Sequence, residues 1–356
     1  MLILASPAFS NWLNPYNELL YNSMARYGVL IEDYSLKSIF AIRKVFRHRF
    51  SIWHLHWPQG GLNSRLFLIA FVSTGLLLSL IKYVRLRGTK VIWTVHDLQA
   101  QEGFHPRLAK LFWQFFIPQL DGYLVLSESG KKIALRRFPS LKKIPGFVVP
   151  HGHYKDAYPN LSNKSDARKH LQIPDSAKVI LFFGRLCNYK NVSQLVSTFL
   201  QISDTDTMLI VAGSPSAGSA SLALAKKIMA QAKIDSRIRC FLNFIPVDEA
   251  QFYFNAADVV VLPYKQILHS GSAFLALSFN KPILVPNKGV FPELKNQMGD
   301  KWVKTYSGEL TLQELRSTID WAINTDRSEC KILEELDWTI IARKTLKAYL
   351  QIVKNN

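Results

Sequence analysis

The sequence predicts an α/β protein with two domains, each built on a parallel sheet. The chain has 356 residues, which is long for one ordinary domain and gives ample length for two cores. In the first half, short apolar segments alternate with helical ones, a pattern typical of parallel sheets covered by helices on both faces. In the second half, two apolar strands about 80 residues apart each run into a helix through a short polar turn.

The first domain is expected to span residues 1–160. No basic leader precedes its first apolar residues, which favours a core strand there rather than a signal peptide. Polar residues collect just after the predicted strands, where ligands of parallel sheets bind. The predicted elements are strands near Leu2–Leu4, Ile52–His56, Lys90–Val95, Tyr123–Leu126 and Phe147–Val149, and a helix from about Pro15 to Tyr27.

Residues 154–164 interrupt the periodicity with Pro159, two Asn residues and one Ser residue, which predicts a linker. The second domain is then expected over residues 165–335. The final segment, residues 338–356, offers apolar side chains for burial and is expected to form a separate C-terminal helix.

The two strand-to-helix turns of the second half carry residues suited to a diphosphate. Helix N-termini present unpaired N–H groups, and an adjacent Arg and Lys can neutralise two phosphates without a metal ion. The alternative is that Arg185 and Lys190 are two solvated charges on a surface loop. The predicted donor-binding residues are Gly184, Arg185, Lys190, Tyr264, Ser270, Gly271 and Ser272.

These turns resemble the donor domain of GT-B glycosyltransferases, especially glycosyltransferase family 4, which carries a Gly-Arg-Leu…Lys signature at this place. Leu209–Gly213, Phe244–Pro246, Ala256–Pro263 and Asn280–Ile283 follow in the order of that family. The resemblance implies the GT-B architecture, in which two Rossmann-like domains face each other across a cleft and the C-terminal helix crosses back to the first domain. It also implies that Arg185 and Lys190 bind a nucleotide diphosphate sugar, the co-substrate, and that no further cofactor is needed.

The sequence departs from that family at one point. Family 4 members usually have two Glu residues eight positions apart before the Gly-Lys-Pro turn. The corresponding positions here are Leu268 and Ala276, whose side chains cannot bind a hydroxyl. Recognition of the ribose and the retaining stereochemistry are therefore both open.

The histidines indicate an active-site cleft in the first half. Five of them follow predicted strands, and they lack the Cys or His-Glu-x-x-His spacing of a metal site, so no metal is predicted. By resemblance, His96 contacts the transferred sugar, and Asp97 is either catalytic or a turn-capping residue. An inverting enzyme needs a general base near the acceptor hydroxyl, and the candidates are Asp97, Glu102 and His153.

The net charge of +18 is uneven, because residues 1–160 contain 20 Lys and Arg against 8 Asp and Glu. This half is expected to face an anionic surface. No nucleic-acid module is recognisable, so we expect a membrane and not a nucleic acid. The apolar segment Leu66–Leu86 is either a core helix or an interfacial helix with a basic rim.

A narrower resemblance, through Asn14–Tyr21, Trp93–Asp97 and His151–Tyr154, links the chain to a bacterial group that includes GDP-mannose:glycolipid 4-β-mannosyltransferases of exopolysaccharide assembly. It implies transfer of a hexose, with mannose from GDP-mannose favoured, to a lipid-linked saccharide. The protein is then expected in the cytoplasm, peripherally bound to the inner face of the cell membrane.

Two alternatives stay open. One is a sugar-nucleotide epimerase of the same architecture, and the other is a non-catalytic basic protein that binds membranes or nucleic acid on a degenerate scaffold. Cys187, Cys240 and Cys330 have no paired spacing and are expected to be free thiols. The sequence leaves the acceptor, the stereochemical outcome and the oligomeric state undecided.

Overall fold

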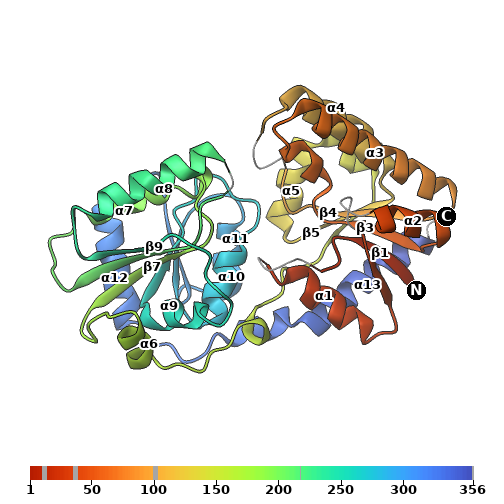
Figure 1. Cartoon of the computed structure of the whole chain (residues 1–356). Helices are drawn as coiled ribbons and strands as arrows, with labels where there is room; N and C mark the ends of the chain where they lie inside the picture. Colours follow the sequence, from red (N-terminus) through yellow and green to blue (C-terminus); the bar gives the residue numbers. More distant parts are fainter. Residues whose placement is uncertain (10–13, 35–38, 99–102, 217, 355–356) are drawn as a thin grey trace. The chain divides into compact units, whose positions relative to one another are not determined.

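The computed structural model describes residues 1–9, 14–34, 39–98, 103–216 and 218–354 (Figure 1). It divides into two compact units, the first formed by Met1–Gly152 with Glu335–Asn356 and the second by His153–Glu334. The boundary between the two units, after Gly152, therefore lies earlier in the chain than residue 160, where the sequence predicts the end of the first domain.

The first unit contains a six-stranded sheet in which every paired neighbour is parallel. Strand order reverses between β1 and β3, and ligands of such sheets bind at the carboxyl ends beside this point. In spatial order the strands are β2 (Leu30–Asp33), β1 (Leu2–Ser6), β3 (Ile52–Leu55), β4 (Lys90–Thr94), β5 (Gly122–Val125) and β6 (Gly146–Val148).

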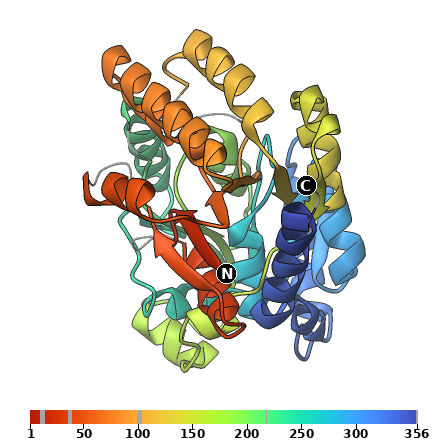
Figure 2. The ribbon, with the colours of Figure 1, turned by 90° about the vertical axis from the view of Figure 1, so that its right-hand side faces the viewer.

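The last helix of the chain belongs to this first unit. It packs along α1, and both helices contribute to a core that includes Tyr16, Tyr349 and Ile352 (Figures 1 and 2). The first unit is thus built from two segments of the chain, and the whole second unit lies between them in the sequence. The helices of this unit are α1 (Tyr16–Ala25), α2 (Ile39–Arg47), α3 (Phe67–Leu86), α4 (Pro106–Phe116), α5 (Glu128–Arg137) and α13 (Trp338–Lys354).

The second unit repeats the same plan. Its sheet is also parallel, and its strand order reverses between β7 and β10. In spatial order the strands are β12 (Val303–Tyr306), β11 (Ile283–Pro286), β10 (Val259–Val261), β7 (Lys178–Phe183), β8 (Thr207–Ala212) and β9 (Ile238–Phe241). Its helices are α6 (Lys164–His170), α7 (Val192–Phe199), α8 (Ser219–Ala232), α9 (Ala250–Ala256), α10 (Gly271–Ser278), α11 (Phe291–Met298) and α12 (Leu312–Asn324).

The predicted class, α/β with parallel sheets, is confirmed, and the predicted strands of the first domain lie within a residue or two of the observed ones. The sequence does not predict β2. This strand has only four residues, two of them acidic, and lies at the sheet edge with Leu30 65% exposed. Charged side chains and short length protect an edge from further pairing, and they also remove the apolar pattern that would reveal the strand.

Helix α12 offers a local test of stability. The Thr311 hydroxyl accepts a hydrogen bond from the Glu314 backbone N–H at 3.2 Å, and the Glu314 carboxylate accepts one from the Thr311 N–H at 3.1 Å. We expect Thr311→Ala to lower the free energy of unfolding by about 1 kcal/mol. Urea unfolding beside Thr325→Ala, at the other end of the helix, measures this. Equal losses in both variants would contradict the capping role.

Candidate active site

The donor-binding residues predicted from the sequence lie at the reversal point of the second sheet. Gly184, Arg185 and Lys190 follow β7, while Tyr264 and the start of α10 follow β10, the neighbouring strand. Because the two strands are parallel, their carboxyl ends meet at one edge. The loops are also joined directly, since the Lys265 N–H donates to the Tyr189 carbonyl at 2.7 Å.

Two of the other predicted residues, Lys190 and Ser272, lie directly against Gly184. A Cβ placed on Gly184 would lie 2.7 Å from the Lys190 Nζ and 2.9 Å from the Ser272 Oγ, and the residue has a positive φ of 138°. Any side chain here would be strained and would collide with both groups. Because Gly184 has no side chain, the Lys190 ammonium and the Ser272 hydroxyl can both lie close to its backbone, as expected of a turn that a phosphate approaches.

Lys190 has an unusual environment. It is 8% exposed, and its ammonium lies over the rings of Tyr264, at 5.4 Å from the centroid, and of Phe182, at 6.0 Å. No carboxylate pairs with it among the described residues. A buried cation without an anion is costly, so this position is one where a bound anion would contribute strongly to stability.

Arg185 is the second cation of this loop. It is half-buried, and its side chain has no hydrogen-bonding or ionic partner in the described part of the chain. The alternative of two ordinary solvated charges therefore does not describe Lys190, which is buried, although it remains compatible with the exposure of Arg185.

The start of α10 completes this group. The Ser270 hydroxyl caps the helix by accepting from the Ala273 N–H at 3.2 Å, and a Cβ on Gly271 would approach the Tyr154 hydroxyl to 3.3 Å. Tyr264 is buried, and its hydroxyl has no hydrogen-bond partner among the described residues. Ala276 stands at one of the two positions where family 4 members usually have Glu, and its methyl side chain supplies no carboxylate. It is fully buried in this helix.

The histidines of the first unit form a cluster at the carboxyl ends of β3 and β4. His56 Nδ1 lies 2.9 Å from His96 Nε2, and the two rings are stacked with centroids 5.2 Å apart. Trp57 also stacks on His96, with centroids 4.5 Å apart, and lies 5.7 Å from the His56 ring. Tyr16 of α1 approaches His96 edge-on at 5.0 Å. His96 is thus held by aromatic rings beside the reversal point of the first sheet.

Asp97 lies next to this cluster. Burial raises the pKa of its carboxyl to about 6, although a hydrogen bond with the Trp57 side chain opposes the rise. A carboxyl with a pKa near the working pH is suited to general base catalysis. Asp97 and His96 are therefore both chemically competent candidates, and Trp57 contacts each of them.

The other two predicted bases are placed differently. His153 belongs to the second unit, where it is buried and its Nδ1 accepts a hydrogen bond from the Lys155 N–H at 3.3 Å. Glu102 lies outside the described residues. No group of three or more His, Cys, Asp or Glu suited to a metal ion occurs in residues 1–9, 14–34, 39–98, 103–216 and 218–354.

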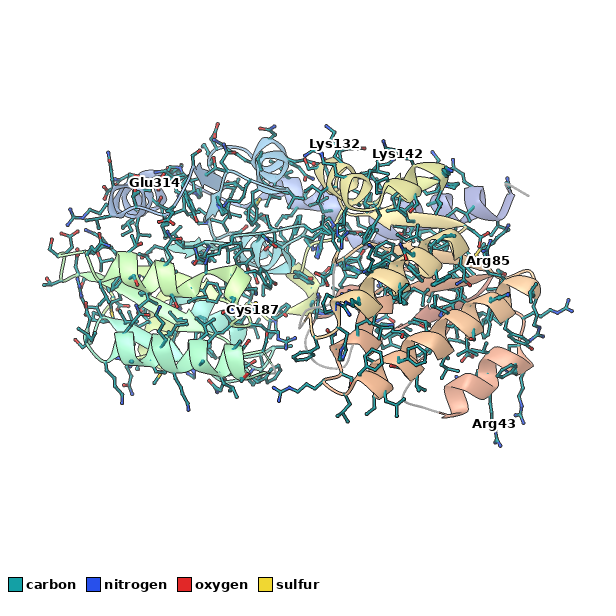
Figure 3. All side chains as sticks on the ribbon, turned by 90° about the horizontal axis from the view of Figure 1, so that it is seen from above. Arg43, Arg85, Lys132, Lys142, Cys187 and Glu314 are labelled. Atoms are coloured by element: carbon teal, nitrogen blue, oxygen red, sulfur yellow. The ribbon has the colours of Figure 1, made fainter. Side chains whose placement is uncertain are left out.

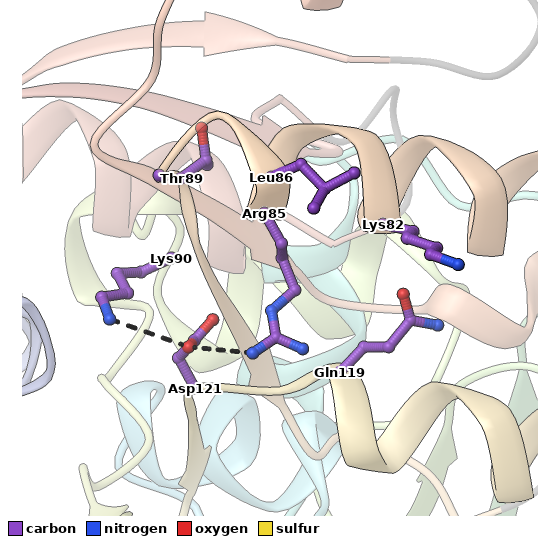
Figure 4. Close-up of a pocket in the computed structure, with 8 residues that line it drawn as sticks. Lys82, Arg85, Leu86, Thr89, Lys90, Gln119 and Asp121 are labelled. Carbon is purple, nitrogen blue, oxygen red and sulfur yellow. Dashed lines mark hydrogen bonds and ion pairs between the residues drawn. The ribbon is translucent and has the colours of Figure 1, made fainter. Parts of the chain in front are cut away.

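A separate pocket of about 570 Å³ lies at the opposite edge of the first sheet, beside the amino ends of β4 and β5 (Figure 4). Arg85 and Lys90 both point to Asp121, at 3.3 and 3.9 Å. The Asp121 carboxylate also accepts from the Val91 N–H at 2.8 Å. Because Asp121 offsets these charges and anchors the start of β4, we interpret this group as structural.

Comparison with known proteins agrees with this geometry. Residues 163–324 match the family described as glycosyl transferases group 1. Over 342 residues, 95% of this chain and 88% of the relative, the chain is 27% identical to the GDP-mannose:glycolipid 4-beta-D-mannosyltransferase of Xanthomonas campestris pv. campestris.

Solved structures share the fold. Sucrose-phosphate synthase from Thermosynechococcus elongatus is similar with a TM-score of 0.73 and 15% identity, covering 100% of this chain and 99% of that one. Anabaena HepE in complex with UDP-glucose is similar with a TM-score of 0.65 and 14% identity, covering 99% and 97%.

Two parallel α/β units of this kind, with a basic turn at the reversal point of the second sheet, define a protein of the GT-B class. Residues 163–324 form a glycosyl transferases group 1 domain, and the protein is a glycosyltransferase. The epimerase and the non-catalytic scaffold, the two alternatives drawn from the sequence, therefore give way to a transferase.

Some residues of the cluster are not predicted from the sequence. Tyr16, Tyr21 and Trp57 contact the histidines, and Tyr349 reaches them from α13. The position of Trp57, directly after a strand that ends in His56, is a usable signal. Nothing local marks Tyr349, since its partners lie almost 300 residues earlier in the chain.

Proposed function

We propose that this glycosyltransferase moves mannose from GDP-mannose to a lipid-linked saccharide in bacterial polysaccharide assembly. The buried, anion-free Lys190 beside Gly184 and Ser272 carries the part of the proposal that concerns a nucleotide diphosphate. The choice of mannose, GDP and a lipid-linked acceptor is supported by the name of the Xanthomonas relative, which aligns with nearly the whole chain. HepE, whose structure holds UDP-glucose, supports a nucleotide sugar as the donor class.

The proposed chemistry assigns separate tasks to the two units. Arg185 and Lys190 would neutralise the diphosphate as it leaves, because charge-assisted bonds strengthen as negative charge develops there. His96 or Asp97 would accept the proton of the attacking hydroxyl. No metal is required in this scheme, since the two cations supply the positive charge.

Exposed apolar residues on α3 support the lipid part of the proposal. Leu66, Phe67, Leu68, Ile69, Phe71 and Val72 are all at least 52% exposed, and Leu111 and Phe115 of the neighbouring α4 are also exposed. The opposite face of α3 is buried against the unit through residues such as Leu77 and Ile81. A helix half-packed and half-exposed fits the interfacial interpretation better than the core interpretation.

By length and composition alone, α3 could also cross a membrane. Its packed face makes binding at the surface the better proposal. Exposed Arg65 directly precedes the apolar residues of α3, and exposed Arg107 and Lys110 lie on α4 close in sequence to Leu111. Exposed Lys82 lies toward the C-terminal end of α3. Further cations are spread over the unit, with Arg43 on α2 and Lys132 on α5 (Figure 3). We propose the inner face of the cell membrane as the surface involved.

We expect the protein to bind vesicles that contain anionic lipid more tightly than neutral ones. Each Lys or Arg near such a surface contributes about 1 kcal/mol, which salt screens. Sedimentation with both vesicle types across a salt series measures it. The double variant Phe67→Ser with Leu68→Ser should lose most binding, whereas Leu161→Ser, an exposed leucine of the second unit, should not. Equal binding of both variants would contradict the role of α3.

The nucleotide specificity can be tested by thermal shift with GDP, UDP, ADP and dTDP. A ligand that binds only the folded protein, present at about 100 times its dissociation constant, stabilises it by about 2.7 kcal/mol. The proposal predicts the largest shift with GDP. A shift with UDP alone would retain the donor site and reject GDP-mannose, and no shift with any diphosphate would reject the donor site.

A further inference from the structure

A chain of buried hydrogen bonds leads from α13 to His96. Tyr349 places its hydroxyl 2.6 Å from His54 Nδ1, and Tyr21 of α1 places its hydroxyl 2.8 Å from the same nitrogen. The Tyr21 hydroxyl also lies 2.7 Å from His56 Nε2. His56 Nδ1 in turn contacts His96 Nε2 at 2.9 Å. All of these groups except His96 are buried.

The rings of His54 and His56, inside this series of hydrogen bonds, are fixed on both sides. His54 Nε2 lies 2.7 Å from the Thr94 Oγ1, so both ring nitrogens of His54 are used. The same holds for His56, which contacts Tyr21 on one side and His96 on the other. Two imidazoles with every ring nitrogen bonded inside a protein core cannot rotate without breaking buried hydrogen bonds, each of which is costly to lose.

The interior members of the chain are neutral at physiological pH. Burial lowers the pKa of His54 to about 3, and burial together with the neighbouring histidines lowers the pKa of His56 well below its usual value. Burial also raises the pKa of Tyr21 and of Tyr349 well above the usual tyrosine value. These four hydrogen-bonded side chains are therefore uncharged, and they act on His96 through the direction of their hydrogen bonds.

Neutrality couples the tautomers along the chain. A neutral imidazole donates from one nitrogen and accepts at the other, so the role of His56 Nδ1 is fixed by what Tyr21 does at Nε2. If His56 accepts from His96 Nε2–H, the other nitrogen of His96, Nδ1, carries its lone pair and is the basic one. The tyrosines thus influence which nitrogen of His96 can take a proton.

We propose that Tyr21, His54, His56 and Tyr349 are positioning residues that hold His96 in one ring orientation and one tautomer for catalysis. This inference rests on the proposed role of His96 in transfer. It assigns a function to α13 beyond packing, because Tyr349 of this helix supplies one of the hydrogen bonds to His54. In the sequence, the whole second unit lies between α13 and the other residues of the hydrogen-bond series.

The test compares Tyr349→Phe and Tyr21→Phe with Tyr34→Phe. Tyr34 is a matched control, since it is buried in the same unit and its hydroxyl has no partner among the described residues. We expect the first two variants to lower kcat by roughly 3- to 10-fold, the effect of losing one hydrogen bond in Tyr349→Phe and up to two in Tyr21→Phe, with KM for the donor unchanged. Tyr34→Phe should leave both constants unchanged. Unchanged kcat in both Tyr349→Phe and Tyr21→Phe would overturn the inference.

A double-variant cycle separates this inference from the role of His96. If Tyr349 acts through His96, Tyr349→Phe should have no further effect on transfer in a His96→Ala background. An equal loss in both backgrounds would overturn the positioning role and leave the catalytic role of His96 intact. Full transfer by His96→Ala alone would instead reject the catalytic role, and the inference with it.

Substitutions of His56 identify which bond matters. An Asn amide can take the place of His56 Nδ1 and keep the contact with His96, whereas a Gln amide reaches toward the place of Nε2 and keeps the contact with Tyr21. We expect His56→Asn to retain more transfer than His56→Gln at equal melting temperature. The reverse order would contradict a role exerted through His96.

Discussion

His96→Ala is expected to slow sugar transfer by about 10²-fold or more and to leave nucleotide affinity nearly unchanged. Removing a general base or a transition-state contact lowers the rate by this order. The residues proposed to bind the nucleotide belong to the second unit, whereas His96 belongs to the first. Transfer rate, donor affinity and melting temperature of one preparation of the variant give the result.

Asp97→Asn is the informative comparison for this experiment. The pKa of about 6 means that the Asp97 carboxyl loses its proton as the pH rises through 6, so a base at this position makes kcat fall on the acidic side of that value. If Asp97→Asn removes this acidic limb and His96→Ala retains a rate near that of the parent, the base is Asp97. A well-folded His96→Ala protein with the parental rate is incompatible with a catalytic His96.

Lys190→Met is expected to weaken binding of the nucleotide diphosphate by about 1.5–3 kcal/mol, the size of a charge-assisted hydrogen bond. Methionine keeps much of the apolar stem that packs near Tyr264, so the loss reports the ammonium. We expect Arg185→Ala to weaken binding in the same direction. Calorimetry with the nucleotide measures both.

Lys265→Met is the matched control for that measurement. Lys265 lies on the loop after β10 and is exposed, and its contact with the other loop is made by the backbone. Its replacement should leave affinity within error of the parent. The donor-site assignment fails if Lys190→Met and Arg185→Ala both bind the nucleotide as tightly as the Lys265→Met control.

The position of the loop that follows β7 could be predicted because its residues are neighbours in the sequence. Gly184, Arg185 and Lys190 lie within seven residues of one another, directly after a strand and before a helix. Such a turn is defined by neighbouring residues, and the parallel pairing of β7 with β10 then brings Ser272 to it. The burial of Lys190 depends on the packing of Phe182 and Tyr264, which the sequence does not reveal.

The histidine cluster could be predicted only in part. The position of His56 and His96 after two strands indicates a shared sheet edge, but the sequence does not show that their rings are bonded to each other. The contribution of Tyr349 depends on α13 returning to the first unit, a feature implied by the family resemblance and not by any local pattern. Long-range contacts of this kind follow from topology, which periodicity does not encode.

Transfer of labelled mannose from GDP-mannose into a lipid-extractable product tests the proposed function most directly. The assay uses the full chain with membranes from a polysaccharide-producing bacterium as the source of acceptor, beside UDP-glucose as the competing donor and Lys190→Met as the variant with a weakened donor site. The account predicts label in the lipid fraction from GDP-mannose, little from UDP-glucose, and a large loss in the variant. Label from UDP-glucose alone, or equal incorporation by Lys190→Met, would contradict it.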